Sequence, residues 1–336
     1  MLQQFSYQDA HGSHPYSVYT PERFPFGSPV PLIVMLHGCA QTTLDFARGT
    51  GMNLLAEQYG FVVLYPQQAR TANQNLCWNW FLPANQQPGS GEPASIAGII
   101  EQMQQNTELW SIDFNRIYVA GISAGAAMAG ILGATYPDVF AAIGVHSGLE
   151  YQAANSLGQS MKAMRSGGPA PQEQGSAAYA VMGPRARVVP TIVFHGTEDH
   201  VVAPLNGDQV VQQWMQTNDL ASNKTYTADY QHPSSMINGQ VPGGYAYLAA
   251  TWNALSGEVV QAYWKIDGMG HAWSGGNPAG SYTDPRGPDA TTVLYHFFMD
   301  HPMKSTEPGH PVPQVQTWSH RIHRILASKF NRKEEK

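Results

Sequence analysis

Residues 119–130, VAGISAGAAMAG, place a serine between two glycines and follow it with a run of small residues. A serine in this setting is either a nucleophile presented on a sharp turn or part of a Gly/Ala-rich corner where a helix packs on a sheet. With 33 glycines in 336 residues, the G-x-S-x-G pattern alone does not separate these two interpretations. The segments before and after Ser123 therefore decide the fold and the chemistry.

Short apolar runs rich in β-branched residues recur along the chain and predict buried strands. They cover residues 31–38, 60–66, 116–123, 140–148, 190–196 and 259–266. Because these runs do not alternate with polar residues, they are typical of a parallel sheet that is covered on both faces. Apolar residues at helical spacing between them, as in 93–110 and 124–137, predict helices. We expect an α/β fold: a doubly wound, mostly parallel sheet with helices on both faces.

Composition limits the possible partners. A formal charge of −6 and a pI near 6.1 argue against nucleic acid as the main ligand. No apolar run approaches the roughly 20 residues that a transmembrane helix needs. The N-terminal residues show no basic segment followed by an apolar one, so no signal peptide is visible and a cytoplasmic location is conceivable.

Two segments interrupt the alternation of strands and helices within a predicted catalytic domain of residues 1–300. Residues 151–187 are polar and have no clear period, which predicts an inserted loop or lid. Residues 218–257 predict a second, irregular insertion. Insertions of this length inside a compact domain are often functional.

The C-terminal part of the chain changes character after the predicted domain. Residues 301–316 are rich in proline and predict a linker, and 317–336 predict a basic amphipathic helix. One face of that helix would carry Trp318, Ile322, Ile325, Leu326 and Phe330. Such a helix either docks on its own domain or adsorbs to a hydrophobic particle.

The context of Ser123 favours a nucleophile. A predicted strand comes directly before this serine, and a predicted helix follows at 124–137. A tight strand–helix turn needs small neighbours, here Gly121, Ala124 and Gly125. The helix N-terminus also brings N–H groups close to the site where an oxyanion would form.

A serine nucleophile needs a base, and the base needs an orienting acid. In a fold of this kind the acid follows the serine in the chain, and the histidine follows the acid. Asp199 stands in the turn after the predicted strand 190–196, and we predict it as the acid. Glu198, in the same turn, and Asp208, at the start of a predicted helix, are the competing candidates.

His271 is the predicted base because it lies in a glycine-flanked loop just after the last predicted strand. Its rivals all lie in or beyond the final helix, and they are His296, His301, His310, His320 and His323. His195 and His200 are interpreted as structural neighbours of the acid loop. The predicted triad is therefore Ser123, His271 and Asp199.

An oxyanion hole needs two backbone donors. The LHGCA segment follows an early predicted strand, so we assign one donor to the N–H of Cys39 and the other to Ala124. His37 would shape that turn and would not act as a base. Trp78, Trp80 and Trp273 are candidate walls of an apolar acyl pocket, although tryptophans equally pack cores.

Five motifs together resemble the polyhydroxybutyrate depolymerase family of esterases, which is close to the feruloyl and acetylxylan esterases. They are LHGCAQT, YPQQ…CWNWF, GISAGAAM with YPDVFAA, HGTEDHVV and GMGHAWSGG, and the resemblance extends from about residue 16 to 300. It implies an α/β-hydrolase fold and cleavage of carboxylic esters without a metal or organic cofactor. It also implies the same triad, the same Cys39 donor, and a disulfide between Cys39 and Cys77, for which two reduced thiols are the alternative.

The resemblance leaves the substrate open. A poly(3-hydroxybutyrate)-type polyester is the first expectation, and a feruloyl or acetylxylan ester is the alternative. An inactive polymer-binding homologue and a peptidase on the same fold are more remote. The family implies an extracellular enzyme, whereas this sequence shows neither a leader nor an appended polymer-binding domain.

Overall fold

The computed structural model describes residues 1–10, 12–24 and 27–303. The chain divides into two compact units, Met1–Pro302 and Met303–Lys336, and every element named below belongs to the first. The predicted helix of 317–336 and nearly all of the predicted linker of 301–316 lie outside the described residues. Among the described helices, none combines the length and the apolar character that a membrane span requires.

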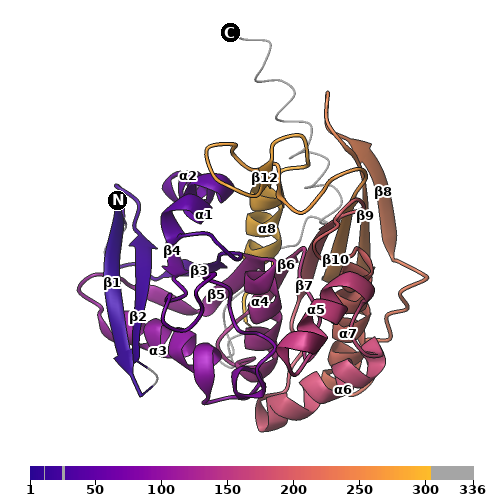
Figure 1. The fold of residues 1–336 in the computed structure, drawn as a ribbon, viewed down its shortest axis with the longest axis horizontal. Coiled ribbons are helices and arrows are strands. Elements are labelled where there is room, and N and C mark those ends of the chain that lie inside the picture. The colour runs from indigo at the N-terminus through magenta and orange to yellow at the C-terminus, as the bar shows by residue number, and fades with distance from the viewer. Residues whose placement is uncertain (11, 25–26, 304–336) are drawn as a thin grey trace. The chain divides into compact units, whose positions relative to one another are not determined.

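Ten of the twelve described strands form one sheet with the order β1-β2-β4-β3-β5-β6-β7-β10-β9-β8 (Figure 1). Its centre is parallel and consists of β4 (Val62–Pro66), β3 (Val30–Leu36), β5 (Ile112–Ile122), β6 (Ala142–His146), β7 (Thr191–Gly196) and β10 (Val259–Ile266). Its edges are antiparallel and consist of β1 (Leu2–Asp9), β2 (Gly12–Tyr19), β9 (Ala246–Asn253) and β8 (Ser235–Gln240). A separate two-residue pair joins β11 (Trp273–Ser274) to β12 (Thr283–Asp284). The predicted doubly wound, mostly parallel sheet is confirmed.

Helices cover both faces of this sheet (Figure 1). On β6, Ile143 packs against Gly133 of α4, whereas the next residue, Gly144, lies against Leu294 of α8. Since successive strand residues point to opposite faces, α4 and α8 lie on opposite sides. The α4 side holds α3 (Gly91–Gln105), α4 (Ala124–Thr135), α6 (Pro171–Met182) and α7 (Leu205–Ala221), and the α8 side holds α1 (Thr43–Thr50), α2 (Met52–Tyr59) and α8 (Ala290–Met299). Two short 3₁₀ turns, Pro83–Gln86 and Gly183–Arg185, complete the helical elements.

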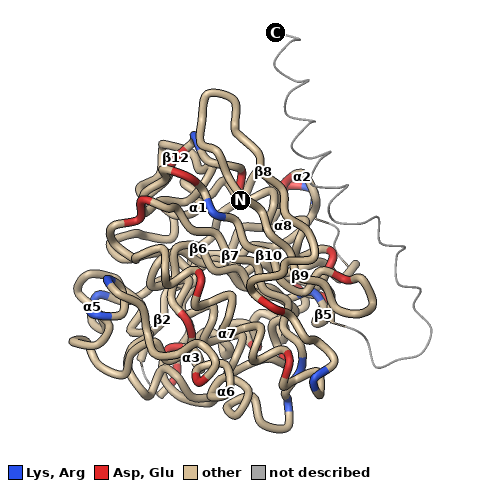
Figure 2. The backbone as a smooth tube through the Cα atoms, turned by 90° about the vertical axis from the view of Figure 1, so that its right-hand side faces the viewer, with Lys and Arg blue, Asp and Glu red and all other residues tan. Residues whose placement is uncertain are grey.

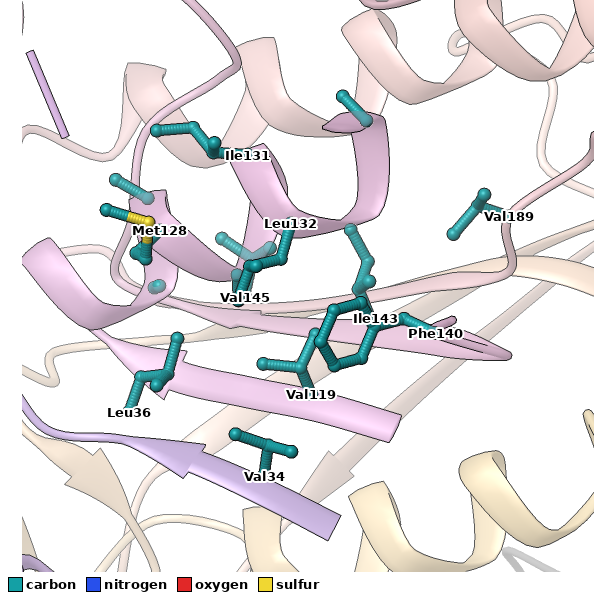
Figure 3. Packing of buried hydrophobic residues seen from close by; sticks show 14 of the residues in the cluster. Val34, Leu36, Val119, Met128, Ile131, Leu132, Phe140, Ile143, Val145 and Val189 are labelled. Atoms are coloured by element: carbon teal, nitrogen blue, oxygen red, sulfur yellow. The ribbon is translucent and has the colours of Figure 1, made fainter. Parts of the chain in front are cut away.

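The core lies between α4 and the central strands. Every residue of β3, β4, β6 and β7 is buried, which explains why these strands read as uninterrupted apolar runs. Figure 3 shows the layer of side chains between helix and sheet, with Met128, Leu132, Val119, Ile143 and Val145. Figure 2 shows acidic and basic positions scattered along the described backbone, in agreement with the low content of charged residues.

The segment 151–187 differs from its prediction as a loop or lid, because it folds into α5 (Leu157–Ser166) and α6. Ser156 caps α5 by accepting the Gln159 N–H, and proline opens α6. The buried face of α6 carries Gly175, Ala178 and Met182. Small residues on that face let α6 pack closely on α7, and a hydropathy pattern does not register them.

The segment 218–257 also differs from the predicted irregular insertion. Helix α7 continues to residue 221, and β8 and β9 then form a hairpin that extends the sheet. The edge strand β8 reads SMINGQ and alternates between half-buried and exposed positions. The sequence does not predict β8 because its residues have weak β-propensity. In the fold, pairing with β9 stabilises this strand.

Candidate active site

Ser123 occupies a strained turn between β5 and α4. Its backbone has φ 57° and ψ −121°, a conformation that a residue with a side chain rarely adopts. The Ser123 N–H donates to the carbonyl of His146 at 3.0 Å, and the Ser123 carbonyl accepts from Ala127 inside the first helical turn. The serine is half-buried, whereas every residue of α4 is buried. This is the backbone geometry that a nucleophile elbow requires.

The two glycines that flank the serine are required by close backbone contacts. A Cβ atom added to Gly125 would lie 2.2 Å from the Leu36 carbonyl oxygen and 2.5 Å from that of His37. A Cβ atom on Gly121 would lie 2.5 Å from the backbone of Gly125. The prediction that small residues surround Ser123 therefore has a physical basis, because the end of β3 passes directly against the elbow.

Asp199 and His271 form a direct hydrogen bond. Asp199 follows β7, His271 follows β10, and these two strands are neighbours in the sheet. The His271 Nδ1 atom lies 2.7 Å from Asp199 Oδ2. With its Nδ1 proton donated to the carboxylate, the neutral ring of His271 carries an accepting lone pair on Nε2. A base needs this tautomer to remove a proton from a serine.

The acid loop holds the Asp199 carboxylate in its ionised form. Its Oδ1 atom accepts the N–H groups of Val201 and Val202 at 2.9 and 2.8 Å, and His195 Nε2 lies 3.5 Å from Oδ2. Burial would raise the pKa of Asp199, but hydrogen bonds from His195 and His271 outweigh it and hold that pKa well below its usual value. His195 is thus a structural neighbour of the acid, as predicted.

The rival acids have other contacts. Glu198 is exposed and lies 3.5 Å from the Nε2 atom of exposed His200. Asp208 lies in α7 and pairs with Lys265 at 2.7 Å while accepting from Tyr230 and Tyr263. Of the three candidates, only Asp199 is seen to contact His271 among the described residues.

Those rival histidines that the structure describes lie in other elements and are not part of the contact between His271 and Asp199. His296 belongs to α8, and the buried His301 bonds to the carbonyls of Phe297 and Val259. His310, His320 and His323 lie outside the described residues.

His37 shapes the loop that carries Cys39. Its Nε2 atom accepts the Gln68 N–H at 3.1 Å, so its proton must lie on Nδ1, which donates to the Gly38 carbonyl at 2.8 Å. Burial lowers the pKa of His37 to about 4, so the ring stays neutral. The Cys39 N–H donates no hydrogen bond to any described residue, and Ala124 is the first residue of α4, whose N–H has no partner within the helix.

The disulfide that the resemblance implied is confirmed. Cys39 and Cys77 are bonded, with their Cα atoms 4.2 Å apart. The CWNW loop on its other side is fixed by half-buried Glu92, which accepts from the Asn79 backbone and side chain and from Gln68. Desolvation raises the pKa of Glu92, against the opposing effect of these hydrogen bonds. The disulfide therefore ties the Cys39 loop to an independently anchored segment.

The three predicted tryptophans are buried. Trp78 donates its indole N–H to the His37 carbonyl at 3.1 Å, and Trp80 is 5% exposed. Trp273 is 1% exposed and donates to Thr291, with its ring stacked on His146. Trp273 thus packs next to the loop of the predicted base, and a role of Trp78, Trp80 or Trp273 in contacting substrate stays a prediction.

His146 escaped the sequence interpretation, although it contacts both the elbow and the loop of the predicted base. The available signal was a histidine at the carboxyl end of a buried apolar strand, next in the sheet to the strand that precedes Ser123. Within the described ranges there is no cluster of three or more His, Cys, Asp or Glu side chains that could hold a metal ion.

Comparison with known proteins identifies the family. The profile described as Esterase PHB depolymerase matches residues 15–228. Poly(3-hydroxyalkanoate) depolymerase C of Paucimonas lemoignei is 34% identical over 77% of this chain, and the match spans 59% of that protein's length. Feruloyl esterase B of Neurospora crassa is 26% identical over 71% of this chain and 86% of its own length.

The fold comparison agrees with the topology. The solved structure of an acetyl xylan esterase from Aspergillus awamori has a TM-score of 0.66, with 24% identity, over 81% of this chain and 94% of that one. That likeness, together with the mostly parallel sheet and its elbow after β5, assigns the α/β-hydrolase fold. The family profile matches more than half of this chain, and the chain therefore belongs to the esterase PHB depolymerase family.

Proposed function

We propose that this chain is a serine esterase that hydrolyses carboxylic esters with Ser123 as nucleophile, His271 as base and Asp199 as orienting acid. One observation carries the proposal, which is the placement of three side chains at the same edge of the sheet. Ser123 occupies a strained elbow, and the Nδ1 atom of His271 is hydrogen-bonded to the buried Asp199 carboxylate at 2.7 Å. The family membership supports the reaction class.

In the first half of the reaction, His271 Nε2 removes the proton of Ser123 as its Oγ attacks the ester carbonyl. The negative charge that develops on the carbonyl oxygen is stabilised by the N–H groups of Cys39 and Ala124. The imidazolium of His271 is stabilised by the ionised Asp199, and it then gives its proton to the departing alcohol.

In the second half, His271 activates a water molecule that attacks the acyl group on Ser123. The same two amides hold the second oxyanion, and collapse of the intermediate releases the acid and returns the proton to Ser123. Asp199 keeps one tautomer of His271 throughout, because its carboxylate accepts the Nδ1 proton.

For the substrate, we propose a poly(3-hydroxybutyrate)-type polyester or its oligomers. The support is the 34% identity to a poly(3-hydroxyalkanoate) depolymerase over 77% of this chain. A feruloyl ester is the second candidate, because the matched region spans 86% of a feruloyl esterase and only 59% of the depolymerase.

The test compares wild type with Ser123→Ala on amorphous poly(3-hydroxybutyrate), methyl ferulate and acetylated xylan. We expect release of 3-hydroxybutyrate by wild type and a loss of at least about 10⁴-fold in kcat for the variant. Circular dichroism checks that the variant is folded, and a fluorophosphonate probe should label only the wild type. Turnover by folded Ser123→Ala close to the wild-type rate would refute the nucleophile, and hydrolysis of methyl ferulate alone would replace the proposed substrate.

A further inference from the structure

His146 stands at the carboxyl end of β6, between the strand that leads to Ser123 and the strand that leads to Asp199. Its side chain is buried, with 1% of the residue exposed. The imidazole is stacked against two rings, with centroids 5.5 Å from Phe194 and 5.0 Å from Trp273 and interplanar angles of 9° and 22°. Stacking against two rings restricts the plane of the imidazole, and hydrogen bonds to its two nitrogen atoms fix the direction in which they point.

Two hydrogen bonds join this residue to different parts of the proposed active site. The backbone carbonyl of His146 accepts the Ser123 N–H at 3.0 Å, which fixes the nucleophile elbow. The ring Nε2 atom accepts the Ser274 N–H at 3.0 Å, three residues beyond the proposed base His271. The nucleophile and the loop of the base are thus held by opposite ends of one rigid residue.

The hydrogen bonds determine the tautomer of His146. An amide N–H can only donate, so Nε2 must carry a lone pair and the proton of the neutral ring lies on Nδ1. That nitrogen lies 3.2 Å from Ser147 Oγ, which can accept the proton. A proton added to Nε2 would point at the Ser274 N–H and break the bond.

The electrostatic surroundings keep His146 neutral. Burial lowers the pKa of His146 well below its usual value, and the nearby His195 and His271 lower it further, against the opposing charge of Asp199. The ring of His146 therefore remains a neutral acceptor at neutral pH. Since both ring nitrogens are engaged, His146 does not serve as a second base.

We propose that His146 is a positioning residue, which holds the loop of His271 in register with the Ser123 elbow through its bond to the Ser274 amide. The inference rests on the proposed esterase function and adds a residue that acts through the base without contacting substrate. Misplacement of a base by a fraction of an ångström slows proton transfer, whereas ground-state binding of the ester depends little on that distance. Loss of the bond should consequently reduce kcat and leave KM nearly unchanged.

The experiment separates the bond from the ring. His146→Phe keeps an aromatic ring between Phe194 and Trp273 but removes the acceptor, and His146→Gln restores a side-chain oxygen that can accept the Ser274 N–H. Phe194→Leu is the matched control, because it removes one stacking partner and leaves both hydrogen bonds of His146 in place. Each protein is measured for kcat, KM, the pH profile of kcat/KM and thermal unfolding on a soluble p-nitrophenyl ester.

We expect His146→Phe to lose about 10- to 100-fold in kcat with KM within about twofold of wild type. His146→Gln should recover at least a third of the wild-type kcat, and Phe194→Leu should lower the unfolding temperature with little change in kcat. The acidic limb of the pH profile should shift only in His146→Phe, because a loosened loop weakens the bond between His271 and Asp199.

Two results would overturn the proposal: a folded His146→Phe with kcat within twofold of wild type, or a folded His146→Gln with kcat about 10-fold or more below wild type. Should His146→Phe fail to fold, the second result still decides. The Ser123→Ala protein separates the two levels of inference. If it hydrolyses the ester normally, the esterase mechanism itself fails, whereas Ser123-dependent turnover that His146→Phe leaves unchanged overturns the positioning role alone.

Discussion

Glu150→Gln should stabilise the protein at neutral pH. Glu150 follows β6, is 2% exposed, and neither of its carboxyl oxygens has a hydrogen-bond partner among the described residues. Gly168 and Ala153 close around it, since a Cβ atom on Gly168 would lie 2.6 Å from Glu150 Oε1. Burial raises the pKa of Glu150 from 4.5 to about 8. An isosteric amide at this position cannot ionise, so it removes the pH dependence without a change in volume.

The sign of the effect follows from proton binding in the two states. Below pH 4.5 the carboxyl is protonated in both the folded and the unfolded chain, so ionisation contributes nothing to their difference. As the pH rises towards 8, the unfolded chain ionises while the folded chain keeps its proton, and wild type loses about 1.36 kcal/mol of stability per pH unit. At pH 7 the accumulated loss is about 3 kcal/mol, which the glutamine variant escapes.

The assay is urea unfolding of wild type and Glu150→Gln at several pH values between 4 and 8, followed by tryptophan fluorescence. Glu173→Gln, at an exposed position of α6, is the matched control and should track wild type throughout. The variant's advantage in unfolding free energy should be near zero at pH 4 and grow steadily to pH 8. A difference that is constant over this range, or a variant less stable than wild type at pH 7, would refute the reasoning.

Two further predictions concern the loops around Ser123. Replacing both Cys39 and Cys77 by alanine should lower the unfolding free energy by about 3–4 kcal/mol, since the disulfide closes a loop of 38 residues. Reduction by dithiothreitol should produce the same loss of stability in wild type and no loss in the double variant. Gly125→Ala should destabilise by more than about 3 kcal/mol through its clash with the end of β3, whereas Gly158→Ala in α5, with open space around it, should gain about 0.5–1 kcal/mol. Unfolding titrations measure both, and equal stability of the two glycine variants would contradict the second.

The sequence predicts those parts of the fold in which the type of residue depends directly on whether the position is buried. Strands buried on both faces must be apolar throughout, so runs such as 190–196 were visible before any pairing was known. The turn at Ser123 is equally recognisable, because a strained residue packed closely against backbone tolerates only small neighbours. The proposed acid and base are predicted from their order after strands of this sheet.

Other parts depend on partners that are distant in sequence. Helix α6 buries Gly175 and Ala178, whose small size matters only because α7 lies against them. The edge strand β8 is polar, and its conformation comes from pairing with β9. The same holds for two hydrogen bonds that join distant segments, Asn79 to Glu92 and Ser274 to His146, the second across 128 residues of sequence. Hydrogen bonds between loops produce no periodic pattern in the sequence, so neither could be predicted.

The proposed catalytic groups stand at the carboxyl ends of strands, where a parallel sheet places loops side by side, but loops alone do not hold atoms to a fraction of an ångström. Each loop here has a separate restraint. The Cys39 loop is bonded to Cys77, and the Asp199 carboxylate closes its own turn through two backbone amides. The loop of His271 has the longest reach from its strand and is held by a bond to a ring on β6. The His146 carbonyl of β6 also accepts the Ser123 N–H. By our proposal, β6 is therefore the common support that sets the distance between the proposed nucleophile and the proposed base.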